Sequence, residues 1–248
     1  MESKSYGYIV AEDRSLVVIP TYNESANILA LIEAIHSVLP SVDVLVVDDN
    51  SPDGTGTLVT KKAMLDHRIY LHHRDKKVGL GAAYVAGFNW ALDRSYSYIF
   101  QMDADFSHDP QYLPELLGAA KTNDIAIGSR WIRGGGVRGW TLRRKILSRC
   151  ANLYARLGLN VPIRDVTAGY KCLRRDALKK IGPENISSLG YGVQIEIVWR
   201  AIQLNLSIVE VPIIFKDRVR GKSKLSSSTF IEALCLVWKF RCLKKKDQ

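Results

Sequence analysis

The sequence predicts an α/β fold, in which a mostly parallel central sheet is flanked by helices and amphipathic helices follow toward the C-terminus. Short apolar runs alternate with helical segments along residues 16–129, an order typical of parallel sheets. One run, Val42–Val47, is continuously apolar, as expected of a strand that is covered on both faces. A length of 248 residues and a hydrophobic content of 47% suit one large domain.

The predicted strands are short runs rich in β-branched and apolar residues. In chain order they are Leu16–Pro20, Val42–Val47, Ile69–His72, Tyr98–Met102, Ile125–Ser129 and Ile208–Val211. The predicted helices mostly open at turn or capping residues. They run from Asn23-Glu24 to about Val38, from Asp53-Gly54-Thr55 to about Leu65, and over Gly79–Leu92, Pro110–Ala120, Thr141–Leu157, Val193–Leu204 and Thr229–Leu243. We expect residues 1–225 to form the domain and residues 226–248 to form a basic amphipathic helix and tail.

The net charge of +10 is unevenly distributed. Residues 1–129 hold 10 basic against 17 acidic side chains, residues 130–149 hold seven basic and no acidic ones, and residues 216–248 hold 10 basic against three acidic ones. An acidic first half followed by two basic blocks indicates a partner rich in phosphate, although a solvated basic face would look the same. The basic blocks lack interleaved aromatic residues, so we expect no nucleic-acid partner.

The cysteines and the ends of the chain favour a cytoplasmic protein. Cys150, Cys172, Cys235 and Cys242 form no Cys-x-x-Cys pair and have no accompanying histidine cluster, so we expect reduced thiols without a disulfide or zinc site. Residues 1–13 lack the apolar core of a signal peptide. No apolar run reaches about 18 residues, so no membrane-spanning helix is expected.

Two carboxylates, Asp103 and Asp105, directly follow the predicted strand Tyr98–Met102. Ligands of open α/β sheets bind at the carboxyl ends of the strands. Carboxylate oxygens suit Mg²⁺ or Mn²⁺, which proteins often hold with one or two carboxylates and substrate phosphates. The pair therefore indicates a metal site, although a solvated strand end is the simpler alternative.

The segments that follow the first two strands indicate a nucleotide pocket. In Pro20–Glu24, Pro20 and Tyr22 can flank a flat base; in Val47–Thr55, a strand-end Asp can accept from a base NH or a ribose hydroxyl. The alternative for Asp48 and Asp49 is turn chemistry, which fits Asp53 better because Gly54 and a helix follow it.

A nicotinamide or flavin site is excluded by the position of the glycine motif. Gly79-Leu80-Gly81 has Tyr84 where a third small residue should stand, and it follows the third strand rather than the first.

Together these motifs resemble the GT-A fold, a Rossmann-like domain, of inverting family 2 glycosyltransferases. The segments that carry the resemblance are Val18–Glu24, Val47–Thr55, Lys77–Gly81 with Ala83-Tyr84, Met102–Asp105 with Ser107-His108, and Gly128–Arg130. Later segments resemble dolichol- or polyprenol-phosphate mannose synthases, especially bacterial ones: Asp165–Tyr170, Gly190-Tyr191 with Gln194 and Glu196, Glu210–Ile213, and Asp217-Arg218 through Gly221–Leu225.

The resemblance implies GDP-mannose as the donor, a polyprenyl monophosphate as the acceptor, and Mg²⁺ or Mn²⁺ as the cofactor. The implied catalytic residues are Asp103, Asp105 and Arg130. The implied donor-binding residues are Pro20, Tyr22, Glu24, Val47, Asp49, Asp103, Ala104, Asp105, Arg130, Arg218 and Lys224. Asp105 is the implied direct metal ligand, and Ser107 stands where some relatives have a glutamine ligand. Direct attack by the acceptor phosphate would invert the anomeric centre.

Arg144 and Ser148 are the candidates for binding the acceptor phosphate, because residues four apart share one helix face. A solvated helix face is the alternative. Beside them, a stripe of Leu142, Ile146, Leu153 and Leu157 would ordinarily belong to the core, but next to so many basic residues it could rest on an anionic membrane.

The last predicted helix has the same character. Its residues Ile231, Leu234, Cys235, Trp238 and Cys242 fall at helical spacing, with cations close by. We expect a peripheral protein on the cytosolic leaflet; the alternatives are a helix that packs on the domain or docks on a separate membrane-anchor subunit.

Three function classes follow from these observations. The first is transfer of mannose to a polyprenyl phosphate. The second is the same class of enzyme with another sugar nucleotide, a polyprenyl-phosphate glycosyltransferase that uses a glucose or aminoarabinose donor. The third is a non-catalytic module that binds nucleotide or phospholipid, which the acidic pair and the arginines Arg130 and Arg218 disfavour. His108 is expected to shape the loop after the metal site rather than to act as a base.

Overall fold

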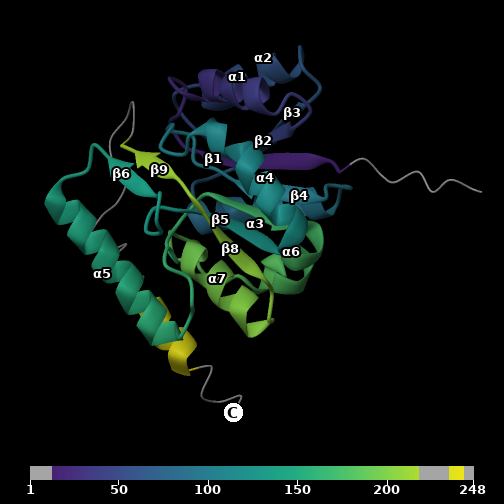
Figure 1. Ribbon diagram of the computed structural model, residues 1–248. Coiled ribbons are helices and arrows are strands. Elements are labelled where there is room, and N and C mark those ends of the chain that lie inside the picture. The colour runs from purple at the N-terminus through teal and green to yellow at the C-terminus, as the bar shows by residue number, and fades with distance from the viewer. Residues whose placement is uncertain (1–12, 218–234, 243–248) are drawn as a thin grey trace, which may run out of the picture.

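A computed structural model describes residues 13–217 and 235–242, and it contains a seven-stranded sheet with helices on both faces (Figure 1). The strands are β1 (Ser15–Thr21), β2 (Asp43–Asp48), β3 (Ile69–His73), β4 (Tyr98–Gln101), β5 (Ile125–Ser129), β6 (Gly136–Arg138), β7 (Lys171–Arg174), β8 (Ile208–Pro212) and β9 (Ile214–Lys216). The helices are α1 (Ile28–Val38), α2 (Thr55–Ala63), α3 (Leu80–Leu92), α4 (Leu113–Thr122), α5 (Leu142–Leu159), α6 (Arg175–Ile181) and α7 (Val193–Gln203), with 3₁₀ turns η1 (Pro110–Tyr112) and η2 (Pro183–Asn185). Residues 235–242 are also helical.

The sheet order is β3-β2-β1-β4-β7-β5-β8, and every pairing is parallel except those of β7 with β4 and β5. The predicted α/β class and mostly parallel sheet are confirmed. All six residues of β2 are buried, as the continuous apolar run indicated. The antiparallel strand β7, the helix α6 and the small β6–β9 pair were not predicted.

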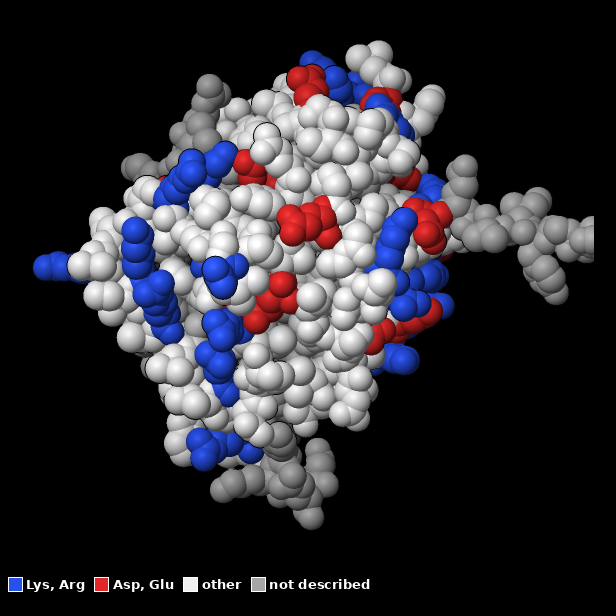
Figure 2. All heavy atoms as spheres, viewed as in Figure 1, with Lys and Arg blue, Asp and Glu red and all other residues white. Residues whose placement is uncertain are grey.

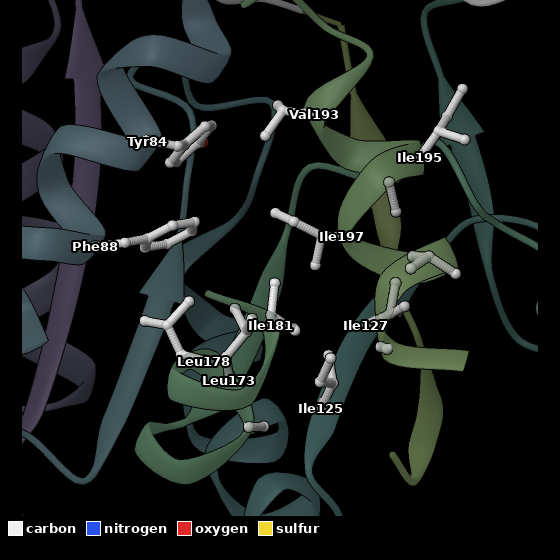
Figure 3. Close-up of a cluster of buried hydrophobic side chains, with 14 of the residues drawn as sticks. Tyr84, Phe88, Ile125, Ile127, Leu173, Leu178, Ile181, Val193, Ile195 and Ile197 are labelled. Carbon is white, nitrogen blue, oxygen red and sulfur yellow. The ribbon is translucent and has the colours of Figure 1, made fainter. Parts of the chain in front are cut away.

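Two hydrophobic clusters cover the two faces of the sheet. On one face, α1 contributes Ile28, Leu31, Ile32 and Ile35, which recur at helical spacing and pack with α4. On the other face, α3, α6 and α7 pack against the sheet, so that Tyr84 and Phe88 meet Val193 and Ile197 (Figure 3). These two layers hold the carboxyl ends of β1, β2 and β4 at one edge.

The antiparallel insertion of β7 has a consequence for that edge. Lys171, the first residue of β7, pairs with Gln101 at the end of β4 and with Ile127 in β5. The segment before β7 therefore enters at the edge where β4 and β5 end, and it brings Asp165 beside Arg130, which follows β5.

The C-terminal helix, residues 235–242, packs on the α7 side of the domain. Leu236, Val237 and Phe240 are buried in the hydrophobic cluster that α3, α6 and α7 form with the sheet. The Phe240 ring stacks on Trp199, with 4.3 Å between ring centroids. Cys235, Trp238 and Cys242 are exposed, as expected for the predicted outward face. Ile231, Leu234, most of the predicted helix Thr229–Leu243 and the expected domain boundary at residue 225 lie outside the described residues.

The four cysteines are free thiols, as predicted. Within residues 13–217 and 235–242, no helix has the length and apolar content needed to cross a bilayer.

Candidate active site

A pocket of about 270 Å³ opens at the carboxyl edge of the sheet. Its residues come from the loops after β1, β2, β3 and β4 and from the segment before α7. They are Pro20, Thr21, Tyr22, Glu24, Asp49, Lys77, Gly79, Leu80, Ala83, Asp103, Ala104, Asp105, Gly190 and Tyr191. The pocket thus lies where open α/β sheets bind ligands.

The loops after β1 and β2 are fastened to each other by side chains that accept backbone N–H groups. Asp53 accepts from Ser25 N at 2.9 Å and from Thr55 N at 3.0 Å, and Thr55 Oγ1 accepts from Glu24 N. Buried Asp48 accepts from the hydroxyl of Thr21 at 2.8 Å and from Ser51. Asp48 and Asp53 therefore shape the pocket wall, as the turn interpretation predicted for Asp53.

The pocket lining includes a carboxylate, Asp49, a cation, Lys77, and an aromatic ring, Tyr22. Asp49 Oδ1 pairs with Arg74 Nη1 at 2.7 Å. Burial raises the pKa of Asp49 above its usual value, although Arg74 opposes the shift. The ammonium of Lys77 lies over the Tyr22 ring, 4.1 Å from its centroid. A flat ring and a hydrogen-bonding carboxylate in the lining of one pocket are suited to a nucleobase.

The acidic pair Asp103 and Asp105 also lines the pocket. Asp103 Oδ1 accepts from the hydroxyl of buried Tyr84 at 3.2 Å, and the Asp103 N–H donates to His108 Nδ1 at 3.0 Å. Because Nδ1 accepts, the proton of neutral His108 is on Nε2. Burial lowers the pKa of His108, even though Asp103 and Asp105 oppose the shift. His108 thus holds the loop after β4, the role that the sequence predicted.

The chemistry of the acidic pair fits a divalent ion. Asp105 is buried at the pocket wall and accepts from Ser107 N at 3.1 Å. The Ser107 hydroxyl is buried and finds no hydrogen-bond partner among the described residues. Those residues contain no group of three or more His, Cys, Asp or Glu side chains that could enclose an ion. Ser107 is not among the residues that line the pocket, so Asp103 and Asp105 are the lining groups that suit an ion. Two carboxylates leave room for the substrate phosphates that such ions also bind.

The segment just before Gly190 and Tyr191 packs so closely against the start of α3 that residues 79 and 81 have no room for a side chain. A Cβ on Gly79 or Gly81 would lie 2.3 Å from Leu189 O or 2.0 Å from Ser188 O. This contact lets Leu189 O accept from Gly81 N at the start of α3. The buried carboxylate of Glu196 holds the same segment by accepting from Ser187 N and Ser188 N. The Gly79-Leu80-Gly81 motif therefore serves packing at the pocket wall.

Seven of the residues implied by the resemblance line the pocket: Pro20, Tyr22, Glu24, Asp49, Asp103, Ala104 and Asp105. The Val47 side chain does not, because in a parallel strand it points into the core, where it packs against Gly87. Arg218 and Lys224 lie outside the described residues. Lys77, Leu80 and Tyr191 line the pocket without having been assigned to it. Lys77 could have been found from its basic loop, since that loop follows a strand beside β2.

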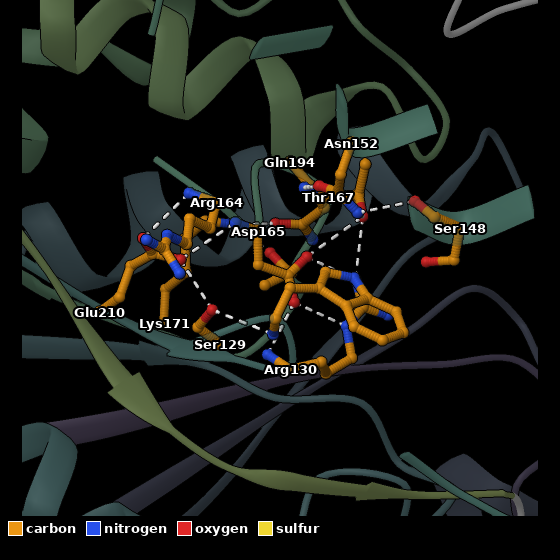
Figure 4. A network of polar contacts seen from close by, with 12 residues as sticks. Ser129, Arg130, Ser148, Asn152, Arg164, Asp165, Thr167, Lys171, Gln194 and Glu210 are labelled. Atoms are coloured by element: carbon orange, nitrogen blue, oxygen red, sulfur yellow. Dashed lines mark hydrogen bonds and ion pairs between the residues drawn. The ribbon is translucent and has the colours of Figure 1, made fainter. Parts of the chain in front are cut away.

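Arg130 does not line the pocket either, because a buried carboxylate engages it (Figure 4). Asp165 accepts from Arg130 Nε at 2.7 Å, Nη2 at 2.6 Å and backbone N at 2.9 Å. Glu210 Oε1 accepts in turn from Asp165 N and from Ser129. Arg130 thus links the ends of β5 and β8 to the segment before β7.

Arg144 and Ser148 lie on α5, outside the pocket lining. Arg144 Nη1 pairs with Asp217 at 3.0 Å, and its guanidinium carbon lies 4.0 Å from the centroid of Trp140. The predicted apolar stripe of this helix is exposed rather than part of the core: Leu142, Ile146, Leu153 and Leu157, joined by Leu147. Lys and Arg side chains form a column on the side of the molecule where Figure 1 places α5 (Figure 2).

Comparison with known proteins agrees with this geometry. Residues 16–182 match the sequence model of glycosyl transferase family 2. The chain is 50% identical to the polyprenol monophosphomannose synthase of Mycolicibacterium smegmatis, over 89% of this chain and 84% of that protein. It is 44% identical to the undecaprenyl-phosphate mannosyltransferase of Micrococcus luteus, over 89% of this chain and 91% of that protein.

Solved structures share the fold at low sequence identity. Glucosyl-3-phosphoglycerate synthase from Mycobacterium tuberculosis, in complex with phosphoglyceric acid, superimposes with a TM-score of 0.68 at 18% identity, over 93% of this chain and 80% of that one. The same enzyme with Mn²⁺, uridine diphosphate and glucosyl-3-phosphoglycerate gives a TM-score of 0.67 at 19% identity, with the same coverage. The fold is thus that of GT-A glycosyltransferases, and the chain belongs to glycosyl transferase family 2.

Proposed function

We propose that this protein transfers mannose from GDP-mannose to a polyprenyl monophosphate with inversion, giving polyprenyl-phosphate β-mannose and GDP. The observation that carries the proposal is that the acidic pair Asp103 and Asp105 lines the same pocket as Tyr22 and Asp49, which suit a nucleobase. The relative at 50% identity is named a polyprenol monophosphomannose synthase, and the relative at 44% identity is named an undecaprenyl-phosphate mannosyltransferase.

In the proposed reaction, the bond between the sugar and the diphosphate breaks, and negative charge develops on the departing GDP. Tyr22 and Asp49 bind the base. Lys77, which lies over the Tyr22 ring at the pocket wall, opposes the charge on the diphosphate. Arg218 and Lys224, in the basic segment that follows β9, are proposed to assist. Arg130 acts from its buried pair with Asp165, by positioning rather than by contact.

A divalent ion, Mg²⁺ or Mn²⁺, is proposed as the cofactor. Asp105 and the hydroxyl of Ser107, which has no hydrogen-bond partner within residues 13–217 and 235–242, would hold it, together with the donor phosphates. When bound, the ion neutralises charge on the leaving diphosphate. Asp103, whose carboxylate is oriented by Tyr84, faces the sugar.

The acceptor needs no general base. A phosphate monoester has its second pKa at about 6, so it is already a dianion near neutral pH. His108 is neutral, and its Nδ1 is occupied by the Asp103 N–H. Direct attack by the phosphate oxygen on the face opposite GDP inverts the anomeric centre. Arg144 and Ser148 are proposed to hold the acceptor phosphate.

The lipid acceptor implies where the enzyme works. Each CH₂ of the lipid tail that enters water costs about 0.8 kcal/mol, so the enzyme must come to the bilayer surface. We propose peripheral binding to the cytosolic face through α5 and the C-terminal helix, directly or with a membrane-anchor subunit.

The test is a transfer assay with radiolabelled GDP-mannose, polyprenyl monophosphate and Mg²⁺, scored for label that enters organic solvent. Parallel reactions contain UDP-glucose instead of GDP-mannose, or omit the acceptor. Label in the lipid phase only with GDP-mannose and acceptor supports the proposal. Transfer from UDP-glucose but not from GDP-mannose would show that the donor is a different sugar nucleotide. The absence of transfer from either donor would favour a non-catalytic binding module.

A further inference from the structure

Helix α5, which carries the proposed acceptor residues, is anchored to the domain through few side chains. Of its 18 residues, only Asn152, Ala155 and Leu159 are buried. It runs along one side of the molecule (Figure 1), and the side chains of its apolar stripe are exposed. Asn152, with 2% of its surface exposed, is the one buried polar residue of this helix.

Both the nitrogen and the oxygen of the Asn152 side-chain amide form hydrogen bonds. Its Nδ2 donates to Thr167 Oγ1 at 3.0 Å, and its Oδ1 accepts from Thr167 N at 3.1 Å. The same Nδ2 donates to Ser148 O at 3.0 Å, one turn earlier in α5. This reciprocal pair fixes both the position and the rotation of the helix, because it is satisfied in only one register.

Thr167 continues the contact into the buried charge network (Figure 4). Its Oγ1 accepts from Arg130 Nη2 at 2.8 Å, and it lies 3.4 Å from Asp165 Oδ1, to which it donates. Asp165 is itself fixed by backbone and side-chain bonds to Arg130 and by Glu210. Asn152 therefore joins α5, through Thr167, to the buried Arg130–Asp165 pair.

Arg144 and Ser148 lie eight and four residues before Asn152, on the same side of the helix. A slip of α5 by one residue would move them about 1.5 Å along the axis and turn them by roughly 100°. A displacement of that size removes a phosphate contact. Few other buried side chains of α5 are available to prevent it.

We propose that Asn152 and Thr167 are positioning residues that set the register of α5 against the Arg130–Asp165 pair and so hold Arg144 and Ser148 at the acceptor phosphate. This inference rests on the proposed acceptor site. Neither residue is assigned a contact with substrate, so both act on acceptor binding through Arg144 and Ser148.

The experiment compares Asn152→Ala, Thr167→Val and Thr167→Ser in the transfer assay, with GDP-mannose and polyprenyl phosphate varied separately. Asn152→Ala and Thr167→Val each remove buried hydrogen bonds, and the expected result is a rise of about tenfold in the acceptor KM. The donor KM should stay within about twofold. Thr167→Ser keeps the hydroxyl and should restore the wild-type KM. Gln203→Ala, which removes an exposed amide at the end of α7, is the matched control.

A double-mutant cycle shows whether the effect passes through Arg144. Once Arg144→Ala has removed the guanidinium, adding Asn152→Ala should raise the acceptor KM by much less than it does alone. Combined with Tyr22→Ala on the donor side, the two effects should add.

The outcomes separate this inference from the function on which it rests. Failure of the wild-type enzyme to label polyprenyl phosphate overturns the proposed function. An active wild type whose folded variants keep the wild-type acceptor KM overturns the positioning role. Equal losses of donor and acceptor binding also overturn it, since they indicate a general structural role. If Asn152→Ala does not fold, the near-isosteric Thr167→Val and its rescue by Thr167→Ser decide the question.

Discussion

Asp105 is the residue on which the proposed chemistry depends most directly. Its replacement by Ala removes a charged oxygen ligand, and we predict that transfer is abolished and that the metal-dependent part of GDP binding is lost. Calorimetric titration of the protein with GDP, once in the presence of Mg²⁺ and once in the presence of a chelator, measures that part. Asp93→Asn, an exposed carboxylate at the end of α3, is the control. Near-normal turnover of Asp105→Ala at low Mg²⁺ would remove Asp105 from the metal site.

Lys171 carries a second prediction at this scale, because it is a fully buried lysine in the central sheet. Its ammonium donates to Ala168 O and to Gln194 Oε1. Burial lowers its pKa to about 7, although Asp165 opposes the shift. Between that value and the ordinary pKa near 10.5, the unfolded chain holds a proton that the folded chain lacks. Raising the pH through this window should therefore stabilise the fold.

Replacing Lys171 by Met should remove this pH dependence. We predict that the free energy of unfolding rises less, or falls more, between about pH 7 and about pH 9 in Lys171→Met than in the wild type. Urea unfolding at several pH values measures it. The buried thiol of Cys172, whose pKa is raised by burial, is present in both proteins and cancels in the comparison. Parallel pH profiles of the two proteins would show that Lys171 does not titrate in this range.

The same residue scale shows why the ion pair of Arg130 with Asp165 was not predicted from the sequence. The family resemblance implied that Arg130 contacts the donor. The partner that neutralises it, Asp165, is 35 residues away and arrives only because β7 enters the sheet antiparallel. Local sequence around Arg130 contains no sign of that pairing.

At the scale of elements, the strands and helices with strong periodicity were predicted closely. β5 matches the predicted range, whereas α1 begins at Ile28 rather than near Asn23. The reason is that the backbone N–H groups of residues 23–25 donate to Ser51, Thr55 and Asp53, so this segment wraps the pocket instead of starting the helix. β7 was missed because its four residues include a buried lysine and because its partners are distant in sequence.

The prediction for α5 concerns the acceptor. Arg144→Ala should spare donor binding and raise the acceptor KM by about one to two decades, because a charge-assisted contact to phosphate contributes roughly 1.5–3 kcal/mol. Arg143→Ala, the neighbouring exposed cation, is the matched control. Steady-state kinetics with each substrate varied in turn measure both effects. Collapse of GDP-mannose affinity with unchanged acceptor dependence would instead assign Arg144 to the donor side.

At the scale of the whole molecule, two exposed features fit a lipid surface. Leu157 on α5 has 73% of its surface exposed, and Trp238 on the C-terminal helix has 66% exposed. Helix α5 and the C-terminal helix are in contact, since the side chain of Val237 packs directly against Gly158. Each exposed Leu that enters the bilayer gains about 1.5–3 kcal/mol, and each nearby cation adds about 1 kcal/mol on anionic lipid. Both terms favour binding of this face to an anionic membrane.

We predict that the protein floats with liposomes that contain anionic lipid and that binding falls as salt rises. Deleting the C-terminal helix would also remove Leu236, Val237 and Phe240 from the core, so point substitutions are the cleaner test. Leu157→Ser and Trp238→Ser should each reduce flotation. Leu65→Ser, which changes an 85% exposed leucine after α2, should not. Salt-insensitive binding, or no binding to any lipid, would contradict peripheral attachment and favour a membrane-anchor subunit, because the same outward face would then be covered by protein.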